Sequence, residues 1–329
     1  MRFPILAGAT ASGKTALGVE VALALRERGL DAEIVTADAF QIFRGMDIGT
    51  AKPTAEEQRG IRHHLIDVVE PNEAFTVAHW LAAANEAIAQ IRSRGGVPIV
   101  VGGTHLYVKS LLDGMFEGPG ADEKLRGELR AMSMGELRAE LERVDPIAAA
   151  RIHPNDERRT VRALEVYRLT GTPISAHQRQ WDAGEAGQGD DRVLVAIEWA
   201  TETLNTRINA RVKEMVARGL VDEVRGLWEA GKFGSQSREA VGYKQLIEHF
   251  ERGNAKHPTL EEAIEQVKIK TRHVGKAQRT WIRRLRTTPN ARFIDAQTLP
   301  PAEWTRIVLE AIGIDGESAR PDNGSIVAR

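Results

Sequence analysis

The sequence predicts an α/β fold, in which a P-loop parallel sheet is flanked by helices and interrupted by an all-helical insertion domain. In the first hundred residues, short β-branched runs alternate with longer amphipathic patterns, which is typical of a parallel sheet covered by helices. The first run leads into residues 8–15, GATASGKT, which fit the phosphate-binding pattern G-x-x-x-x-G-K-[ST]. A strand-free stretch of charged amphipathic patterns then interrupts the alternation and predicts the insertion.

Five short apolar runs predict the strands of the sheet: residues 3–7, 33–37, 65–69, 97–101 and 192–197. The patterns between the first four runs predict helices over 14–28 and 77–94. Each of these patterns ends in arginine followed by glycine, as the C-termini of helices prefer. The phosphate-binding stretch therefore joins the first strand to the first helix.

The chain divides into four predicted parts. Residues 1–118 form the first part of the core, and residues 119–190 form the helical insertion domain. The second part of the core, residues 191–313, is mostly helical, and residues 314–329 form a polar tail that we expect to be flexible. The predicted helices of the insertion are 125–132, 134–144, 146–152 and 158–170, and those of the second part are 203–230, 242–252 and 260–285.

The composition excludes several classes of protein. The chain has no cysteine, which rules out disulfides, thiol nucleophiles and cysteine-ligated zinc. Its nine histidines show no metal-ligand spacing beyond the adjacent His63 and His64, which we predict to serve packing and hydrogen bonding. No apolar run approaches the length of a membrane span and no leader precedes the first strand, so we expect a cytoplasmic monomer with no membrane partner.

The stretch 8–15 predicts a phosphate site built from a glycine-rich turn and the N-terminus of a helix. Lys14 adds a positive charge, and the hydroxyl of Thr15 is a candidate ligand for Mg²⁺. The predicted phosphate-binding residues are Gly8, Ala9, Thr10, Ala11, Ser12, Gly13, Lys14 and Thr15.

The usual partners of a nucleoside-triphosphate site are missing from the sequence. The strand 97–101 ends in Gly102-Gly103-Thr104 where a magnesium-binding aspartate is expected, and no N-K-x-D stretch reads a guanine. Asp38 is the one acid at the end of a core strand, beside the phosphate loop, where ligands bind in such sheets. Either Asp38 is functional or it only caps a turn.

A basic stretch lies near the end of the second part of the core. Residues 268–286 contain eight lysines and arginines and no acid, although the net charge of the whole chain is −1. On a helix, one face carries the basic residues Lys268, Arg272, Lys276, Arg279, Arg283 and Arg286, and another carries Val267, Val274, Trp281 and Leu285. We expect Trp281 to be buried. The basic face either binds a nucleic-acid backbone or is an ordinary solvated surface.

Several motifs together resemble the tRNA dimethylallyltransferases, also called isopentenyl-diphosphate:tRNA transferases. They occur in order over about residues 5–285: GATASGKT at 8–15, TADAFQIFRGMDIGTAKP at 36–53, RHHLID at 62–67, VGGTHLYVKSLL at 101–112, NDERRTVRALEVYRLTG at 155–171 and VGYKQ at 241–245. The pairing of RGMDIGTAKP with GGTxLY is highly specific. The resemblance implies that the phosphate loop binds the diphosphate of dimethylallyl diphosphate, with Mg²⁺.

The resemblance also implies an acceptor and a set of roles. The five-carbon group would pass to the exocyclic amine of the adenosine 3′ of the anticodon, in tRNAs that read codons beginning with U. Asp38 matches the base that accepts the amine proton, and Thr10 matches a threonine near the diphosphate. Arg211 resembles the arginine that completes the diphosphate clamp. Lys14 and Thr15 would serve the leaving group and the metal.

The partner implied by the resemblance is a tRNA anticodon stem-loop. Asp38, Ala39, Phe40 and Gln41 would hold the flipped adenine, and the other implied tRNA contacts are Thr104, Arg158, Arg159, Arg162, Arg238, Gly242, Tyr243, Lys244, Arg279 and Arg283. The chain departs from the family at D-A-F-Q in place of D-S-x-Q, at Arg158-Arg159 in place of Q-R, and at Lys276-Ala277-Gln278 in place of K-R-Q. The last two departures concern individual tRNA contacts.

Two other functions fit parts of the sequence. In a small-molecule P-loop kinase, Asp38 would activate a substrate hydroxyl and Lys14 would hold the β- and γ-phosphates of ATP. The missing magnesium aspartate and the long insertion count against a kinase. A noncatalytic, nucleotide-switched RNA-binding protein would keep the loop and the basic face but would not need Asp38.

Overall fold

The computed structural model of the 329-residue chain describes residues 1–114, 118–177, 191–251 and 259–314. The chain forms two compact units, one made of Met1–Val108 with Gly189–Arg329 and the other of Lys109–Gln188. The predicted tail, residues 314–329, lies outside the described residues except for Ile314.

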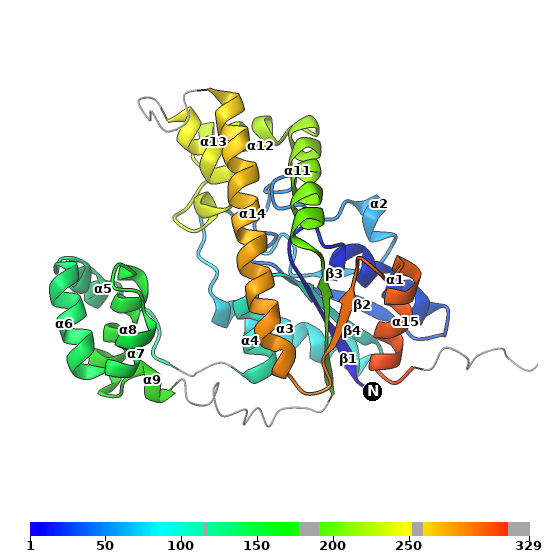
Figure 1. The fold of residues 1–329 in the computed structure, drawn as a ribbon, viewed down its shortest axis with the longest axis horizontal. Helices are drawn as coiled ribbons and strands as arrows, with labels where there is room; N and C mark the ends of the chain where they lie inside the picture. Colours follow the sequence, from blue (N-terminus) through cyan, green and yellow to red (C-terminus); the bar gives the residue numbers. More distant parts are fainter. Residues whose placement is uncertain (115–117, 178–190, 252–258, 315–329) are drawn as a thin grey trace, which may run out of the picture. The chain divides into compact units, whose positions relative to one another are not determined.

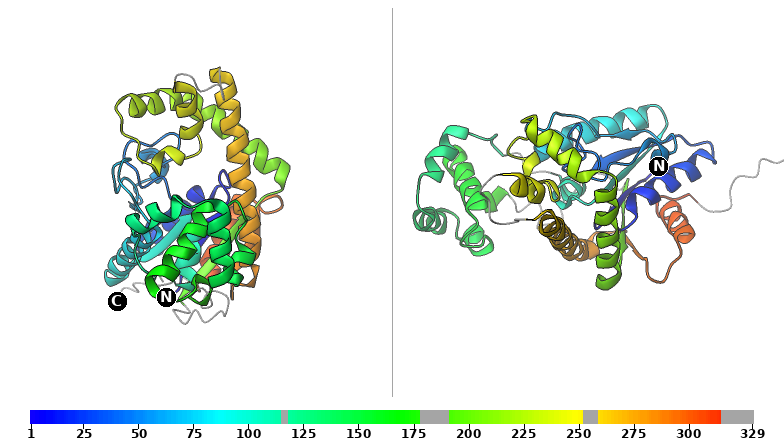
Figure 2. Two further views of the ribbon diagram at one scale, coloured as in Figure 1. Left: turned by 90° about the vertical axis from the view of Figure 1, so that its left-hand side faces the viewer. Right: turned by 90° about the horizontal axis from the view of Figure 1, so that it is seen from above.

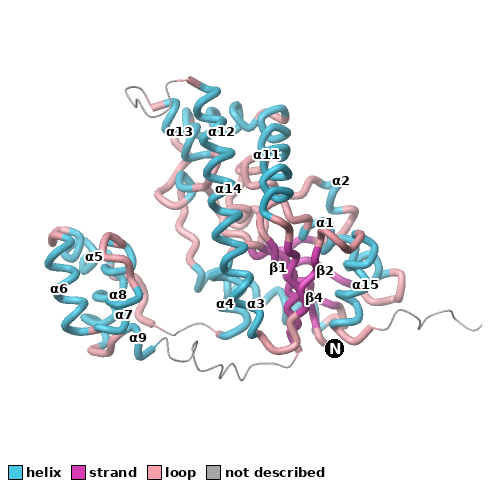
Figure 3. The backbone as a smooth tube through the Cα atoms, viewed as in Figure 1, coloured by secondary structure: helices cyan, strands magenta, loops and turns pink. Residues whose placement is uncertain are grey.

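The larger unit is built on one six-stranded sheet with the order β3-β2-β4-β1-β5-β6 (Figures 1 and 3). All adjacent strands are parallel, and Ile5 of the central strand lies beside Val100 and Leu194. The strands are β1 (Phe3–Gly8), β2 (Ala32–Ala37), β3 (His63–His64), β4 (Val97–Gly102), β5 (Arg192–Glu198) and β6 (Arg292–Asp295). Strands β1, β2 and β4 are buried along their whole length, as expected where helices cover both faces of a parallel sheet.

Helices cover both faces of this sheet (Figure 2). Helix α1 (Lys14–Arg26) packs on β2 and β4 and contacts α15 (Pro301–Ala311), which packs on β5 and β6. Helix α3 (Val77–Ser93) also packs on β2 and β4, from the opposite face. The α/β prediction with a parallel, helix-flanked sheet is confirmed.

Four of the five predicted strands are confirmed, and the strand predicted at 65–69 is wrong. The chain is extended only at His63–His64, because Leu65 and Asp67 adopt positive φ angles of 63° and 55°. A left-handed residue ends an extended run, and Val69 forms only an isolated bridge with Phe43. The short strand β6 was not predicted.

A group of helices follows β5 at the carboxyl ends of the strands (Figure 1). They are α11 (Thr201–Ala217), α12 (Leu220–Glu229), α13 (Tyr243–Phe250) and α14 (Leu260–Arg284). The helix predicted over 203–230 is two helices, because Gly219 adopts a φ of 100° and ends the first. The remaining short elements of this unit are α2 (Ala55–Gln58), η1 (Ser237–Glu239) and η2 (Leu285–Thr287).

The smaller unit is helical. Helix α4 (His105–Asp113) begins in the larger unit, and α5 (Glu123–Arg130), α6 (Met134–Val144), α7 (Pro146–Arg151), α8 (Glu157–Thr170) and α9 (Ile174–His177) follow. Its apolar core includes Leu129, Leu137, Leu141 and Leu164. Glu165 is buried beside this core, where it pairs with Arg126 at 2.9 Å and Arg162 at 2.6 Å.

Candidate active site

The phosphate loop runs from Gly8, the last residue of β1, to Lys14, the first of α1. Its tight path needs two left-handed residues, Ala11 with a φ of 61° and Gly13 with a φ of 94°. A Cβ on Gly8 would lie 2.3 Å from the hydroxyl oxygen of Ser12 and 3.2 Å from its Cβ, so a larger residue would force Ser12 to move. The geometry is that of an anion cradle at a helix N-terminus.

Three side chains from distant parts of the chain hold this loop from outside. Arg207 Nε donates to the carbonyl oxygen of Ala11 at 2.8 Å, and Trp199 Nε1 donates to that of Ser12 at 3.0 Å. The amide oxygen of Gln278 accepts from the backbone N–H of Thr10 at 2.8 Å. Arg207 also stacks over the Trp199 ring, 4.5 Å from its centroid. These supports were not predicted, since no local motif marks them.

The site holds two cations beside one carboxylate. Burial and the neighbouring Arg211 lower the pKa of Lys14 from 10.5 to about 8, against the opposing effect of Asp38. Burial likewise holds the pKa of Arg211 below its usual value, although Asp38 favours its charged form. In the described part of the chain, no side-chain carboxylate forms an ion pair with either cation. The site therefore has positive charge available for an anion, in a setting that burial makes electrostatically strong.

Asp38 follows β2 directly and has a structural role in addition to any chemical one. Its Oδ1 accepts from the backbone N–H groups of Phe40 at 2.9 Å and Gln41 at 3.2 Å. Among the described residues, none donates a hydrogen bond to Oδ2. The Thr104 hydroxyl accepts from the Ala39 N–H at 3.0 Å, which holds the turn against the end of β4. The Asp38 carboxylate is close enough to Lys14 and Arg211 to favour the charged form of each.

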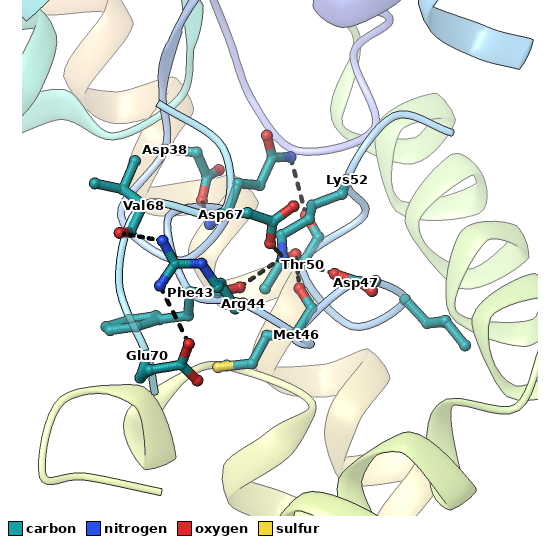
Figure 4. Close-up of polar contacts among 12 residues, drawn as sticks. Asp38, Phe43, Arg44, Met46, Asp47, Thr50, Lys52, Asp67, Val68 and Glu70 are labelled. Atoms are coloured by element: carbon teal, nitrogen blue, oxygen red, sulfur yellow. Dashed lines mark hydrogen bonds and ion pairs between the residues drawn. The ribbon is translucent and has the colours of Figure 1, made fainter. Parts of the chain in front are cut away.

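The chain after this turn is held by its own polar side chains (Figure 4). Gln41, which is 9% exposed, donates from Nε2 to the carbonyl oxygens of Thr50 and Ala51, each at 3.1 Å. Lys52 is buried and contacts the Phe43 carbonyl and the carboxylates of Asp47 and Asp67. Gln41, which the resemblance places among the residues that hold the adenine, therefore uses its amide NH2 group to hold the loop.

Tyr243 also departs from its expected position at the tRNA surface. It is fully buried and donates its hydroxyl to Glu223 at 2.5 Å. Burial and Glu223 raise the pKa of this phenol. Glu223 also accepts from the backbone N–H groups of Asp47, Ile48 and Gly49, at 3.0, 2.7 and 3.1 Å. Tyr243 thus supports the RGMDIGTAKP segment from within, and its ring is not a surface for RNA.

Only some of the side chains on the basic face of α14 are available to bind an RNA backbone. Lys268 pairs with Glu265 at 2.8 Å, Arg272 donates to Asn209 at 2.7 Å, and Arg286 pairs with Glu198. Lys276, Arg279 and Arg283 have no ion-pair or hydrogen-bond partner for their side chains within the described chain. Arg283 is exposed and Arg279 is half-buried.

The apolar face of α14 is less buried than predicted. Val274 is 37% exposed, and Trp281 is half-buried beside the ring of His105, with centroids 5.6 Å apart. The prediction of a buried Trp281 is wrong, because a helix as long as α14 meets its neighbours through only part of its length. Helix α14 packs closely on α11 at Gly275, where a Cβ would lie 3.0 Å from the side chain of Ile208.

The other candidate tRNA contacts fall into two groups. Arg238 and Lys244 are paired with Glu251 and Glu239, at 2.8 and 2.6 Å, and Gly242 has a φ of 99° at the start of α13. Arg158, Arg159 and Arg162 belong to the smaller unit. There Arg158 is exposed, Arg159 lies 3.4 Å from Asp156, and Arg162 donates to Glu165 and to the Pro119 carbonyl.

The histidine pair has the structural role that we predicted. His64 contacts the buried Glu33 at 2.6 Å, and His63 contacts the Ile61 carbonyl at 2.9 Å. Burial pushes the pKa of Glu33 up, but hydrogen bonds from His64 and Arg94 hold it below its usual value. In the residues described, no three acidic or histidine side chains gather to hold a metal ion. No described helix is long and apolar enough to cross a membrane.

Comparisons with known proteins agree with this geometry. The IPP transferase family matches residues 41–285. A tRNA dimethylallyltransferase from Geobacter metallireducens is 44% identical over 288 residues, which cover 86% of this chain and 90% of that protein. The crystal structure of a full-length tRNA isopentenylpyrophosphate transferase from Bacillus halodurans matches with a TM-score of 0.66 at 36% identity, covering 94% of this chain and 96% of that one.

A eukaryotic relative extends the comparison to a protein studied with its RNA. Crystallographic snapshots of a eukaryotic dimethylallyltransferase acting on tRNA match with a TM-score of 0.71 at 28% identity. The match covers 85% of this chain and 69% of that one.

Proposed function

Since the chain belongs to the IPP transferase family, we propose that it transfers the dimethylallyl group of dimethylallyl diphosphate to the N6 amine of an adenosine in tRNA. The proposed acceptor is the adenosine 3′ of the anticodon in tRNAs that read codons beginning with U. The observation that carries the proposal is the placement of Asp38 beside Lys14 and Arg211, next to a phosphate loop. In the proposal, Asp38 is the base and the phosphate loop with Lys14 and Arg211 is the diphosphate site.

In the proposed reaction, the N6 nitrogen attacks the allylic carbon as the bond between that carbon and the diphosphate oxygen breaks. The amine proton passes to Asp38, and diphosphate leaves. Negative charge grows on the leaving oxygens, where the loop amides, Lys14 and Arg211 stabilise it. The amine becomes acidic only as the C–N bond forms, so a correctly placed carboxylate suffices as the base. Asp38 needs correct placement, which its turn supplies.

Mg²⁺ is the proposed cofactor. Thr15 is only half-buried at the start of α1, and its hydroxyl has no partner among the described residues. Mg²⁺ usually takes most of its ligands from substrate phosphates and water, so one protein oxygen beside a diphosphate is enough to help bind it. When bound, the ion would neutralise charge on the leaving diphosphate.

The proposed tRNA partner requires a basic surface and an extruded base, because a stacked adenine cannot reach such a site. Lys276, Arg279 and Arg283, which have no partner among the residues that the structure describes, supply positive charge on the helix that carries Gln278, and Gln278 touches the phosphate loop. The basic face of α14 is therefore proposed to bind the anticodon stem-loop. We further propose that this activity is cytoplasmic.

The test is a single-turnover reaction of the purified protein with dimethylallyl diphosphate, Mg²⁺ and unmodified tRNA. We expect mass spectrometry of the digested tRNA to find a net gain of C5H8 on the adenosine 3′ of the anticodon, because one C5H9 group replaces one hydrogen of the amine. A tRNA with that adenosine replaced by guanosine is the matched control and should stay unmodified. Absence of transfer, together with turnover of ATP on a small-molecule hydroxyl, would instead support the P-loop kinase.

A further inference from the structure

We propose that Gln278 is a positioning residue that holds the diphosphate side of the active site in register with its base side, and that links both to helix α14. This inference rests on the proposed function. The amide of Gln278 reaches two loops at once. Its Oε1 accepts from the Thr10 N–H at 2.8 Å, and its Nε2 donates to the Gly103 carbonyl at 3.0 Å.

Those two loops follow adjacent strands and carry different parts of the chemistry. Thr10 belongs to the phosphate loop after β1, and Gly103 follows β4, the neighbour of β1 in the sheet. Gly103 precedes Thr104, whose hydroxyl holds the Ala39 N–H beside Asp38. One side chain therefore connects the loop that holds the leaving group to the turn that carries the base.

The fit around this amide is close. A Cβ on Gly103 would lie 2.7 Å from Gln278 Nε2 and 2.9 Å from the Gly8 carbonyl, so only a glycine admits the contact. One turn earlier on α14, a Cβ on Gly275 would lie 3.0 Å from Ile208 and 3.9 Å from Thr10. Helix α14 thus lies directly against the phosphate loop, and Gln278 has little freedom to shift.

The chemistry of the side chain suits this bridge. A side-chain amide has both an acceptor oxygen and a donor NH2 group, which match the N–H of Thr10 and the carbonyl of Gly103. A carboxylate would have no donor for Gly103, and an ammonium would have no acceptor for Thr10. Along the chain, Gln278 stands between Lys276 and Arg279, two of the three basic-face cations that have no partner among the described residues. A tRNA backbone that binds these cations would therefore act on the phosphate loop through Gln278.

The test compares wild type with Gln278→Met, which keeps the length of the side chain but loses both hydrogen bonds. Single-turnover prenyl transfer is measured with dimethylallyl diphosphate and tRNA both saturating. We expect the rate to fall by about 10- to 100-fold, because small misplacements of reacting groups have effects of this size. We expect the Kd for tRNA to change less than about threefold, as the cations remain. Thr280→Ala, an exposed position on the same helix, is the matched control and should react like wild type.

A second readout separates positioning from a merely structural role. Calorimetry gives the affinity of a nonreactive thiolo analogue of dimethylallyl diphosphate, with and without tRNA. We expect tRNA to tighten analogue binding to wild type, and we expect this effect to vanish in Gln278→Met. If the methionine variant does not fold, Gln278→Asn, which keeps the amide but cannot reach both loops, carries the same expectations.

The outcomes distinguish this inference from the proposed function. If wild type prenylates tRNA and a folded Gln278→Met matches it in rate and in the effect of tRNA on analogue binding, the inference is overturned while the proposed function stands. If wild type itself transfers no prenyl group, the proposed function fails and takes this inference with it.

Discussion

At the scale of single residues, Asp38 combines two roles that the sequence could not separate. One carboxylate oxygen accepts the hydrogen bonds of the turn from Phe40 and Gln41, and the other has no donor among the described residues. The negative charge of the carboxylate favours the charged forms of Lys14 and Arg211. A turn former and a base are therefore compatible in one side chain. A substitution that keeps the turn but removes the carboxylate therefore tests the role of Asp38 in proton transfer alone.

Asp38→Asn should leave binding of both substrates nearly intact and lower turnover by about two to four powers of ten, the usual contribution of a general base. The asparagine oxygen can still accept from Phe40 and Gln41, so the turn survives, but the proton has no acceptor. The defect belongs in kcat more than in KM. Single-turnover transfer with saturating tRNA measures it. A variant that binds normally and reacts within a few-fold of wild type would leave Asp38 only its structural role.

The lowered pKa of Lys14, about 8, predicts a pH dependence of diphosphate binding. The protonated amine binds the anion, so affinity should be full below about pH 7 and should weaken by up to about tenfold per unit above pH 8. Lys14→Arg keeps its charge throughout this range and should flatten the profile, which makes it the matched control. Calorimetry with the nonreactive analogue from pH 6.5 to about 9.5 tests this. An equally steep profile for both proteins would assign the titration to another group.

Residue identity in the phosphate loop could be predicted because the chemistry is local. The positions of Gly8, Gly13, Lys14 and Thr15 follow from one short pattern that joins a strand to a helix. Arg207, Trp199 and Gln278, which hold the same loop, lie far away in the chain. Only tertiary contact brings them there, and no spacing in the sequence indicates it.

At the scale of elements, the hydrophobic periodicity of the sequence predicted the helices well. It failed where a residue with a positive φ angle ends a strand or a helix. The run 65–69 is apolar enough for a strand, but two left-handed residues, Leu65 and Asp67, turn the chain. The helical pattern of 203–230 continues across Gly219, where a φ of 100° divides it. The basic helix α14 was predicted within one residue of its end, yet its charges are not equivalent.

Replacing Arg279 and Arg283 by alanine should weaken binding of all substrate tRNAs to a similar extent. Each lost phosphate contact should subtract about 0.7 to 0.9 from the slope of log K against log salt. The matched control is the double variant Lys268→Ala and Arg272→Ala, which removes the same charge from the same helix. These two side chains are engaged with Glu265 and Asn209, so their loss should matter less. Equal effects of the two variants, or an unchanged slope, would contradict a role for the unpaired cations.

At the scale of the whole molecule, the fold brings the phosphate loop and Asp38 to the carboxyl ends of β1 and β2, which lie on either side of β4. The parallel order β2-β4-β1 places Asp38, Gly103 and the phosphate loop at one edge of the sheet. This juxtaposition follows from the α/β class and was predictable. The support of the RGMDIGTAKP segment by Glu223 and Tyr243 was not, because it depends on helices far along the chain.

The whole site also predicts which phosphates the protein selects. We expect pyrophosphate and the nonreactive dimethylallyl analogue to bind with Kd values in the micromolar range, about −8 kcal/mol, and ATP to compete only weakly. The loop, Lys14 and Arg211 supply charge for two phosphates. No N-K-x-D stretch reads a base, and the strand before Gly102 ends without a magnesium aspartate. Calorimetry with each ligand in the presence of Mg²⁺ gives the comparison.

The control for this selectivity is Lys14→Ala, which should weaken pyrophosphate and the analogue together, because the ammonium meets the phosphates and not the five-carbon group. Any residual ATP binding through the same loop should weaken with them. Tight binding of ATP to wild type, with turnover that Asp38→Asn abolishes, would mean that the same cradle and the same carboxylate serve phosphoryl transfer. If ATP binds weakly while the analogue binds with a micromolar Kd, the phosphate loop accommodates two phosphates and not three. An allylic diphosphate requires a site of this size.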